Sequence, residues 1–279
     1  MAHGDEPAYT HAHELHDDGS VTFACATDAA AWPWLALDPH DPIVVQTLCY
    51  YGSYEVAVFR GHYESGQWSA LTFTDWHCGA PGVGHAVRGI SHAPTGEEGR
   101  HFQLGFYDAE DRLVSEMGGT GVVFRNRDFE SWRSAQKRDL GPPADLARFP
   151  FVDARDVGMR SPVECYVSAL DTGQGIAAMA LVTRENGFPP QHPYHDGSGD
   201  HVNASHLADA ARQFLRLLKG GAAAAVTGGE MRFSSYVELG HPFQLELMAV
   251  DAANASYDIA IRQAGRDCAA IRLLISVAE

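Results

Sequence analysis

The stretch from Asn203 to Gly221, NASHLADAARQFLRLLKGG, has the strongest helix signal in the chain. Asn203 can cap the start of a helix, and Lys219 followed by two glycines is a normal helix end. The residues between them are apolar over much of the helix circumference. We therefore expect a buried helix here, with His206 on its exposed side.

The first half of the chain contains a second helix of the same kind. Asp41 and Pro42 open the run IVVQTLCYYGSYEVAVF. The proline suits the first helical position, and the aspartate can cap it. This run is also apolar around most of its circumference, so each half of the chain has one helix suited to a core.

Strand-like segments follow each helix at the spacing of an antiparallel meander. In the first half they are WSALTFTDWHC, VGHAVRGIS, HFQLGFYDA and LVSEMGGTGVVF. In the second half they are MRFSSYVEL, PFQLELMAVD, SYDIAIRQ and CAAIRLLISVA. Further strand material precedes each helix: VTFACAT in the first half, VECYVSAL and IAAMALVT in the second. The repeated order predicts a duplicated α+β fold, in which each antiparallel sheet wraps around a buried helix.

A Pro- and charge-rich stretch separates the two halves. We predict an N-terminal half over residues 1–136, a linker over 137–160 and a C-terminal half over 161–279. The 279 residues agree with about two units at roughly 150 residues per domain.

Composition limits the partners and the compartment. The formal net charge of −16 makes nucleic acid and anionic membranes poor partners. The five cysteines are scattered without a CxxC pair, and no apolar stretch resembles a signal peptide or a membrane span. We therefore expect a cytoplasmic protein without a disulfide scaffold.

The duplicated pattern resembles a double hot-dog fold with pseudo-two-fold symmetry. The specific likeness is to the A-factor (γ-butyrolactone) biosynthesis hot-dog family. It lies in His40–Gln46 (HDPIVVQ), Asp200–Gln213 (DHVNASHLADAARQ) and the run GTGVVFRNRDFESWR. Gln46 and Asp209 stand where that family has Glu. The resemblance implies transfer of a β-ketoacyl group from a carrier protein to a small hydroxylated acceptor, with Arg212 holding an acceptor phosphate.

A second resemblance is to the hot-dog dehydratases that act on 3-hydroxyacyl carrier-protein thioesters. His195 lies fourteen residues before Asp209, as in those enzymes. The run from Asp209 to Gln213 is similar to the DxxxQ helix of polyketide-synthase dehydratase domains, which are double hot-dogs. The leading function that this implies is dehydration of a 3-hydroxyacyl thioester by a lyase of polyketide or fatty-acid-like biosynthesis, part of secondary metabolism.

Dehydration needs a base for the C2 proton and an acid for the departing C3 hydroxyl. Neutral imidazole is available at pH 7, so His195 is a candidate base, and His40, before the first helix, is the alternative. Asp209 is the expected acid, because burial beneath an acyl chain favours a neutral carboxyl. Which histidine acts with Asp209 stays open at this stage, as does a non-catalytic role in acyl binding.

The substrate-binding candidates lie near the two helix starts. Glycines let the backbone approach a thioester closely, and free N–H groups at a helix start can hold its oxygen. The candidates are Gln46, Gly197, Gly199, Arg212 and Gln213. We expect no cofactor other than the phosphopantetheine of an acyl carrier protein, or coenzyme A, that carries the substrate. We also expect no metal site, since His11, His13 and His16 fall in what looks like a solvated N-terminal segment.

A local positive patch stands out in this acidic chain. It consists of Arg125, Arg127, Arg133, Lys137 and Arg138. We expect it to dock an acidic acyl carrier protein or the phosphates of coenzyme A. The alternative is internal pairing with neighbouring acidic residues. Whether the protein forms a homodimer stays open.

Overall fold

The computed structural model describes residues 8–62, 68–93, 102–124, 129–138, 140–160, 164–186 and 201–276. The chain divides into two compact units, Met1–Arg125 and Asn126–Glu279. The boundary between them falls before residue 136, and the stretch 137–160, predicted to be a linker, lies within the range of the second unit.

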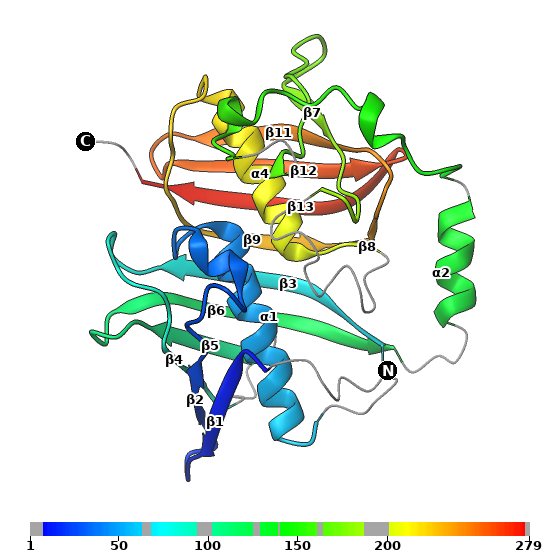
Figure 1. Ribbon diagram of the computed structural model, residues 1–279. Coiled ribbons are helices and arrows are strands. Elements are labelled where there is room, and N and C mark those ends of the chain that lie inside the picture. The colour runs from blue at the N-terminus through cyan, green and yellow to red at the C-terminus, as the bar shows by residue number, and fades with distance from the viewer. Residues whose placement is uncertain are drawn as a thin grey trace. The chain divides into compact units, whose positions relative to one another are not determined.

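The first unit has an antiparallel sheet with one long helix across its face (Figure 1). Among the residues described, its strand order is β1–β2–β4–β5–β6–β3. The elements are β1 (Thr10–Leu15), β2 (Val21–Cys25), η1 (Pro33–Ala36), α1 (Pro42–Phe59), β3 (Trp68–Cys78), β4 (Arg88–Ser91), β5 (Phe102–Tyr107) and β6 (Leu113–Phe124).

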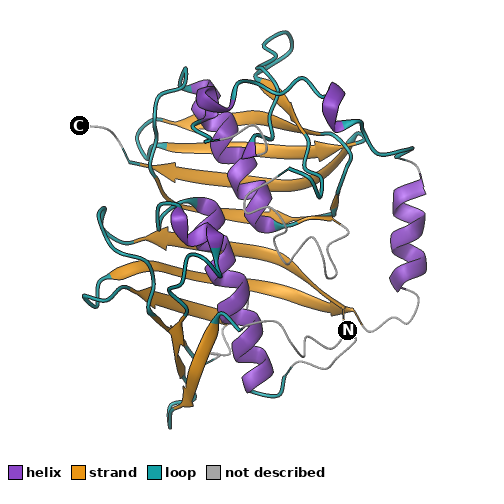
Figure 2. Ribbon diagram, in the orientation of Figure 1, coloured by secondary structure: helices purple, strands orange, loops and turns teal. Residues whose placement is uncertain are grey.

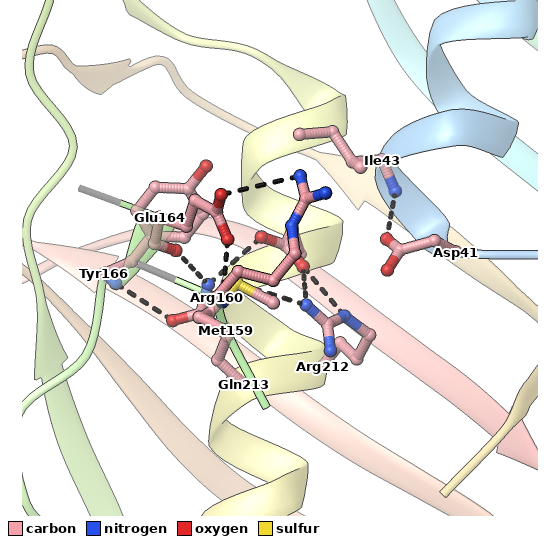
Figure 3. Close-up of polar contacts among 9 residues, drawn as sticks. Asp41, Ile43, Met159, Arg160, Glu164, Tyr166, Arg212 and Gln213 are labelled. Atoms are coloured by element: carbon pink, nitrogen blue, oxygen red, sulfur yellow. Dashed lines mark hydrogen bonds and ion pairs between the residues drawn. The ribbon is translucent and has the colours of Figure 1, made fainter. Parts of the chain in front are cut away.

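Local signals and close packing fix α1 on this sheet. The Asp41 carboxylate accepts a hydrogen bond from the Ile43 N–H at 3.1 Å, as expected of an N-cap (Figure 3). Farther along the helix, a Cβ built on Gly52 would lie 2.8 Å from the Phe106 ring of β5. The helix therefore approaches the sheet more closely than a larger residue at position 52 would allow.

A buried carboxylate fastens the turn between β5 and β6. Asp108 accepts hydrogen bonds from the backbone N–H groups of Gly84, Glu110 and Arg112 and from the Arg112 guanidinium. The side chain of Asp108 is buried, so these donors replace the water that it loses on folding.

The second unit repeats the arrangement of sheet and helix (Figure 2). Within the described part of this unit the strand order is β9–β13–β12–β11–β7, all antiparallel, with β8 paired to β10. The elements are α2 (Phe129–Arg138), η2 (Leu146–Arg148), η3 (Ala154–Val157), β7 (Ala177–Ala180), β8 (His201–Val202), α4 (Ala204–Leu218), β9 (Val226–Phe233), β10 (Val237–Glu238), β11 (Phe243–Asp251), β12 (Ser256–Gln263) and β13 (Arg266–Ile275).

The predicted α+β class and both long helices are confirmed. The meanders are confirmed for three strands in each unit, β4–β5–β6 and β11–β12–β13; the first strand after each long helix pairs instead with the last strand of its unit, β3 with β6 and β9 with β13. Three segments differ from their sequence-based expectation. The N-terminal histidine segment forms β1, and the stretch of the predicted docking patch after β6 contains α2. The described part of VECYVSAL forms isolated bridges, such as Val167 with Ala180, and no named strand. No helix among the described residues is long and apolar enough to cross a membrane.

Candidate active site

Helix α4 carries a buried carboxylate in its second turn. Asp209 is 2% exposed, and the residues on either side of it, Leu207 to Ala211, are buried as well. An unpaired charge in such a place would cost several kcal/mol, so a carboxylate here needs partners that compensate for the loss of water.

Those partners are N–H donors of two side chains on the same helix. Its Oδ1 accepts hydrogen bonds from Nε of Arg212 at 2.8 Å and from a terminal guanidinium nitrogen at 2.5 Å. Its Oδ2 accepts one from the Gln213 amide at 3.1 Å. All three residues lie on α4, and the spacings i,i+3 and i,i+4 bring them together on the helix surface.

Gln213 connects this carboxylate to the chain segment before β7 (Figure 3). Its Oε1 accepts a hydrogen bond from the Tyr166 N–H at 2.9 Å, and its Nε2 donates to the Glu164 carbonyl at 2.8 Å. Gln213 is fully buried, and both ends of its amide are used inside the protein. Its hydrogen bonds orient the Asp209 carboxylate, and its predicted role in substrate binding stays a prediction.

Met159, Arg160, Glu164 and Tyr166 lie near Arg212 and Gln213 (Figure 3). A terminal guanidinium nitrogen of Arg212 lies 3.7 Å from the thioether sulfur Sδ of Met159. The Glu164 carboxylate accepts a hydrogen bond from the Arg160 N–H at 2.9 Å. Arg212 is 13% exposed at its side chain and engages Asp209, so its predicted role in holding an acceptor phosphate stays a prediction.

Two other predicted residues lie in the first unit. Gln46 is buried in α1, and His40 lies half-buried just before that helix. Gln46 Nε2 and His40 Nε2 are buried and have no hydrogen-bond partner among the described residues. The pairing of His40 with Asp209 stays a prediction, and His195, Gly197 and Gly199 lie outside the described residues.

One member of the predicted docking patch has another role. Arg133 is buried, and its guanidinium binds both oxygens of Glu238 at 2.5 and 2.7 Å and covers the Tyr236 ring. It is therefore not part of a docking surface, because this ion pair anchors α2 to β10 inside the second unit. Lys137 is half-buried and Arg138 exposed on α2, whereas Arg125 and Arg127 lie outside the described residues.

His206 was expected to cover the exposed face of the helix and was not among the predicted site residues. It is fully buried in the first turn of α4. Its ring Nδ1 lies 2.9 Å from Oδ1 of Asn203, the residue that caps α4. Its position three residues after the cap and three before Asp209 could have indicated this neighbourhood.

None of the five cysteines is suited to act as a nucleophile. Burial raises the thiol pKa to about 12 for Cys25, Cys49 and Cys78, to about 11 for Cys165, and above its usual value for Cys268. Thiols with such pKa values stay protonated near pH 7 and react poorly. The described residues also contain no group of His, Cys, Asp and Glu that could hold a metal ion.

Comparison with known proteins gives similarity at the level of the fold. No protein-family model matches the chain, and neither does any curated protein. A solved structure described as a putative oleoyl thioesterase from Lactobacillus plantarum matches with a TM-score of 0.57 and 10% identity, covering 93% of this chain and 96% of that one. The 12:0-ACP thioesterase from Umbellularia californica matches with a TM-score of 0.55 and 10% identity, covering 94% and 99%.

Dehydratases share the fold as well. A dehydratase from the CurK module of the curacin polyketide synthase, with a histidine replaced, matches with a TM-score of 0.52 and 12% identity over 98% of this chain and 97% of that one. The chain thus has the double hot-dog fold found in acyl-ACP thioesterases and polyketide-synthase dehydratases. These comparisons do not show the A-factor family.

Proposed function

We propose that the protein processes acyl thioesters and that hydrolysis of the thioester bond is its reaction. The observation that carries the proposal is the buried carboxylate of Asp209, which Arg212 pairs with and Gln213 orients. The substrate class is taken from solved structures with this fold, which are described as acyl-ACP thioesterases and polyketide-synthase dehydratases. An acyl carrier protein is the partner that would deliver the substrate.

The ion pair of Asp209 with Arg212 favours hydrolysis over the dehydration expected from the sequence. To donate a proton to the departing hydroxyl, Asp209 would have to give up this pair, whereas it can keep the pair while it accepts a hydrogen bond from water. A charged carboxylate is suited to orient a water molecule. Its Oδ2 accepts one hydrogen bond within the described structure, and a carboxylate oxygen has room for another donor.

Water is then the nucleophile in our proposal. Its oxygen bonds to the thioester carbonyl carbon, the C–S bond breaks, and the carrier thiol leaves with a proton. A covalent acyl-cysteine route is disfavoured, because burial keeps the thiols of all five cysteines protonated. The N–H groups at the start of α4 lie about one and a half turns before Asp209 and can stabilise the oxyanion.

Dehydration is the second candidate, and the Asp209–Gln213 hydrogen bond favours it. This pair has the spacing of the DxxxQ helix that the sequence resembles. Variants of the CurK dehydratase with a histidine or an aspartate replaced are described as inactive. In this reaction His195 or His40 would supply the base, and Asp209 would first have to leave its pair with Arg212.

One experiment separates these reactions. An acyl carrier protein loaded with a 3-hydroxyacyl chain is incubated with the protein and analysed by intact mass. Release of the free pantetheine thiol supports hydrolysis, whereas loss of the mass of one water supports dehydration and refutes our leading proposal. Loss of the acyl group only when a hydroxylated acceptor is added would indicate acyl transfer. An unchanged mass across acyl chain lengths would overturn acyl-thioester processing.

The Asp209→Asn variant tests the site itself. We expect a fall in turnover of about 100-fold or more, because the asparagine lacks the charge that orients the water and stabilises positive charge nearby. A matched control is Asp258→Asn, which also removes the aspartate of an Asp–Arg pair, here with Arg272 on the sheet. Equal turnover of the two variants would place the reaction elsewhere.

A further inference from the structure

A histidine lies beside the carboxylate on the same helix and has no role in the reaction described so far. His206 is fully buried in the first turn of α4. Its backbone N–H donates to Oδ1 of Asn203 at 3.1 Å, and its ring Nδ1 lies 2.9 Å from the same oxygen. One side chain thus caps the helix and fixes the plane of the imidazole.

This arrangement determines which ring nitrogen carries the proton. Because the His206 backbone N–H donates to it, the Asn203 atom is the amide oxygen and not the amide nitrogen. An amide oxygen only accepts hydrogen bonds, so Nδ1 must be the donor. The neutral ring therefore has its lone pair on Nε2, the atom that can take up a proton.

His206 and Asp209 belong to one cluster. Residues three apart on a helix have Cβ atoms about 5–6 Å apart, so the imidazole and the carboxylate are neighbours on α4. The Tyr166 ring meets the His206 ring edge to face, with centroids 5.9 Å apart. The Tyr166 N–H donates to Gln213, which in turn donates to Asp209. All these residues lie in the second unit.

We propose that His206 is the general base of the thioester hydrolysis; this inference rests on the function proposed above. Nε2 accepts a proton from water as the water oxygen bonds to the carbonyl carbon. The resulting imidazolium returns that proton to the sulfur when the C–S bond breaks, so the ring ends neutral. Asp209 stays in its ion pair with Arg212 throughout and stabilises the imidazolium electrostatically.

Imidazole suits this step better than the carboxylate does. An unperturbed imidazole is mostly neutral at pH 7 and has a proton affinity close to that needed of a base at this pH. Oδ1 of the Asp209 carboxylate already accepts two N–H donors from Arg212 and is therefore engaged in the ion pair. In this proposal the His206 imidazole therefore moves the proton, and the Asp209 carboxylate provides the fixed charge.

A purely structural histidine would serve only to brace the cap of α4, and one substitution distinguishes this role from catalysis. The amide nitrogen of an asparagine at position 206 lies where Nδ1 lies and can still donate to Asn203, but nothing replaces Nε2. We expect His206→Asn to keep a melting temperature close to that of the wild type and to lose turnover by about 10²- to 10⁴-fold. His77→Asn, which removes an exposed histidine, is the control and should retain full turnover.

The test is turnover of acyl carrier protein thioesters by intact mass, together with ¹⁵N NMR of the histidine rings. Loss of turnover in folded His206→Asn, with Nδ1 protonated and Nε2 unprotonated in the wild-type ring, supports the proposal. Full turnover of His206→Asn, or a His206 ring protonated on Nε2 alone, overturns the base while leaving hydrolysis intact. A wild-type protein that hydrolyses no thioester overturns the proposed function and the base with it.

Discussion

Removing the guanidinium that neutralises Asp209 should destabilise the second unit strongly. In Arg212→Met, the methionine preserves much of the apolar length of the side chain, but among the residues that the structure describes, Asp209 keeps a side-chain hydrogen bond from Gln213 alone. Asp209 is 2% and Arg212 13% exposed at the side chain, so solvent offers little compensation. Breaking a buried ion pair by removing one partner costs about 3–5 kcal/mol, and the slight exposure of Arg212 points to the lower end, about 3 kcal/mol.

The corresponding assay is thermal unfolding. For a unit of this size, 1 kcal/mol shifts the melting temperature by about 2–4 °C, so Arg212→Met should melt about 6–12 °C lower than the wild type. The double variant Asp209→Asn/Arg212→Met removes the stranded charge and should recover most of that loss. A melting temperature for Arg212→Met within about 2 °C of the wild type would refute the reasoning, as would a double variant less stable than the single one.

Two further predictions concern the first unit. Burial raises the pKa of Asp108, but its hydrogen-bond donors outweigh burial and hold that pKa at about 2. Because the unfolded value is about 3.9, the stability from Asp108 is present above pH 4 and lost as the pH falls towards 2. Melting curves should show this loss in the wild type, and a similar acid dependence in Asp108→Asn would contradict it. Gly52→Ala should cost about 1–3 kcal/mol in urea unfolding, since its Cβ would lie 2.8 Å from Phe106; an unchanged midpoint would show that the ring moves aside freely.

Local signals were sufficient for the two long helices. Asp41 and Asn203 each accept a hydrogen bond from an N–H in the first turn, and this depends only on residues within three positions. The strands of the meanders could be predicted for the same reason, since their alternation and their turns are local.

Elements held by distant partners escaped prediction. The start of β1 is fixed by the Glu55 carboxylate of α1, which accepts the N–H groups of Tyr9 and Thr10. Helix α2 is fastened by the pair of Arg133 with Glu238, 105 positions farther along the chain. Nothing near either segment in the sequence signals these partners, so the first was interpreted as a solvated end and the second as a docking patch.

In the candidate site, too, some features follow from local sequence and others depend on distant partners. The sequence by itself determined that Asp209, Arg212 and Gln213 share one side of a helix, because helical periodicity fixes which side chains are neighbours. The folded structure was needed to show that the Gln213 amide hydrogen-bonds to the Glu164 carbonyl and the Tyr166 N–H. It was also needed to show that His206 is buried beside Asn203. Burial and long-range hydrogen bonds depend on which surfaces the folded chain brings against the helix, and periodicity along one helix carries no information about them.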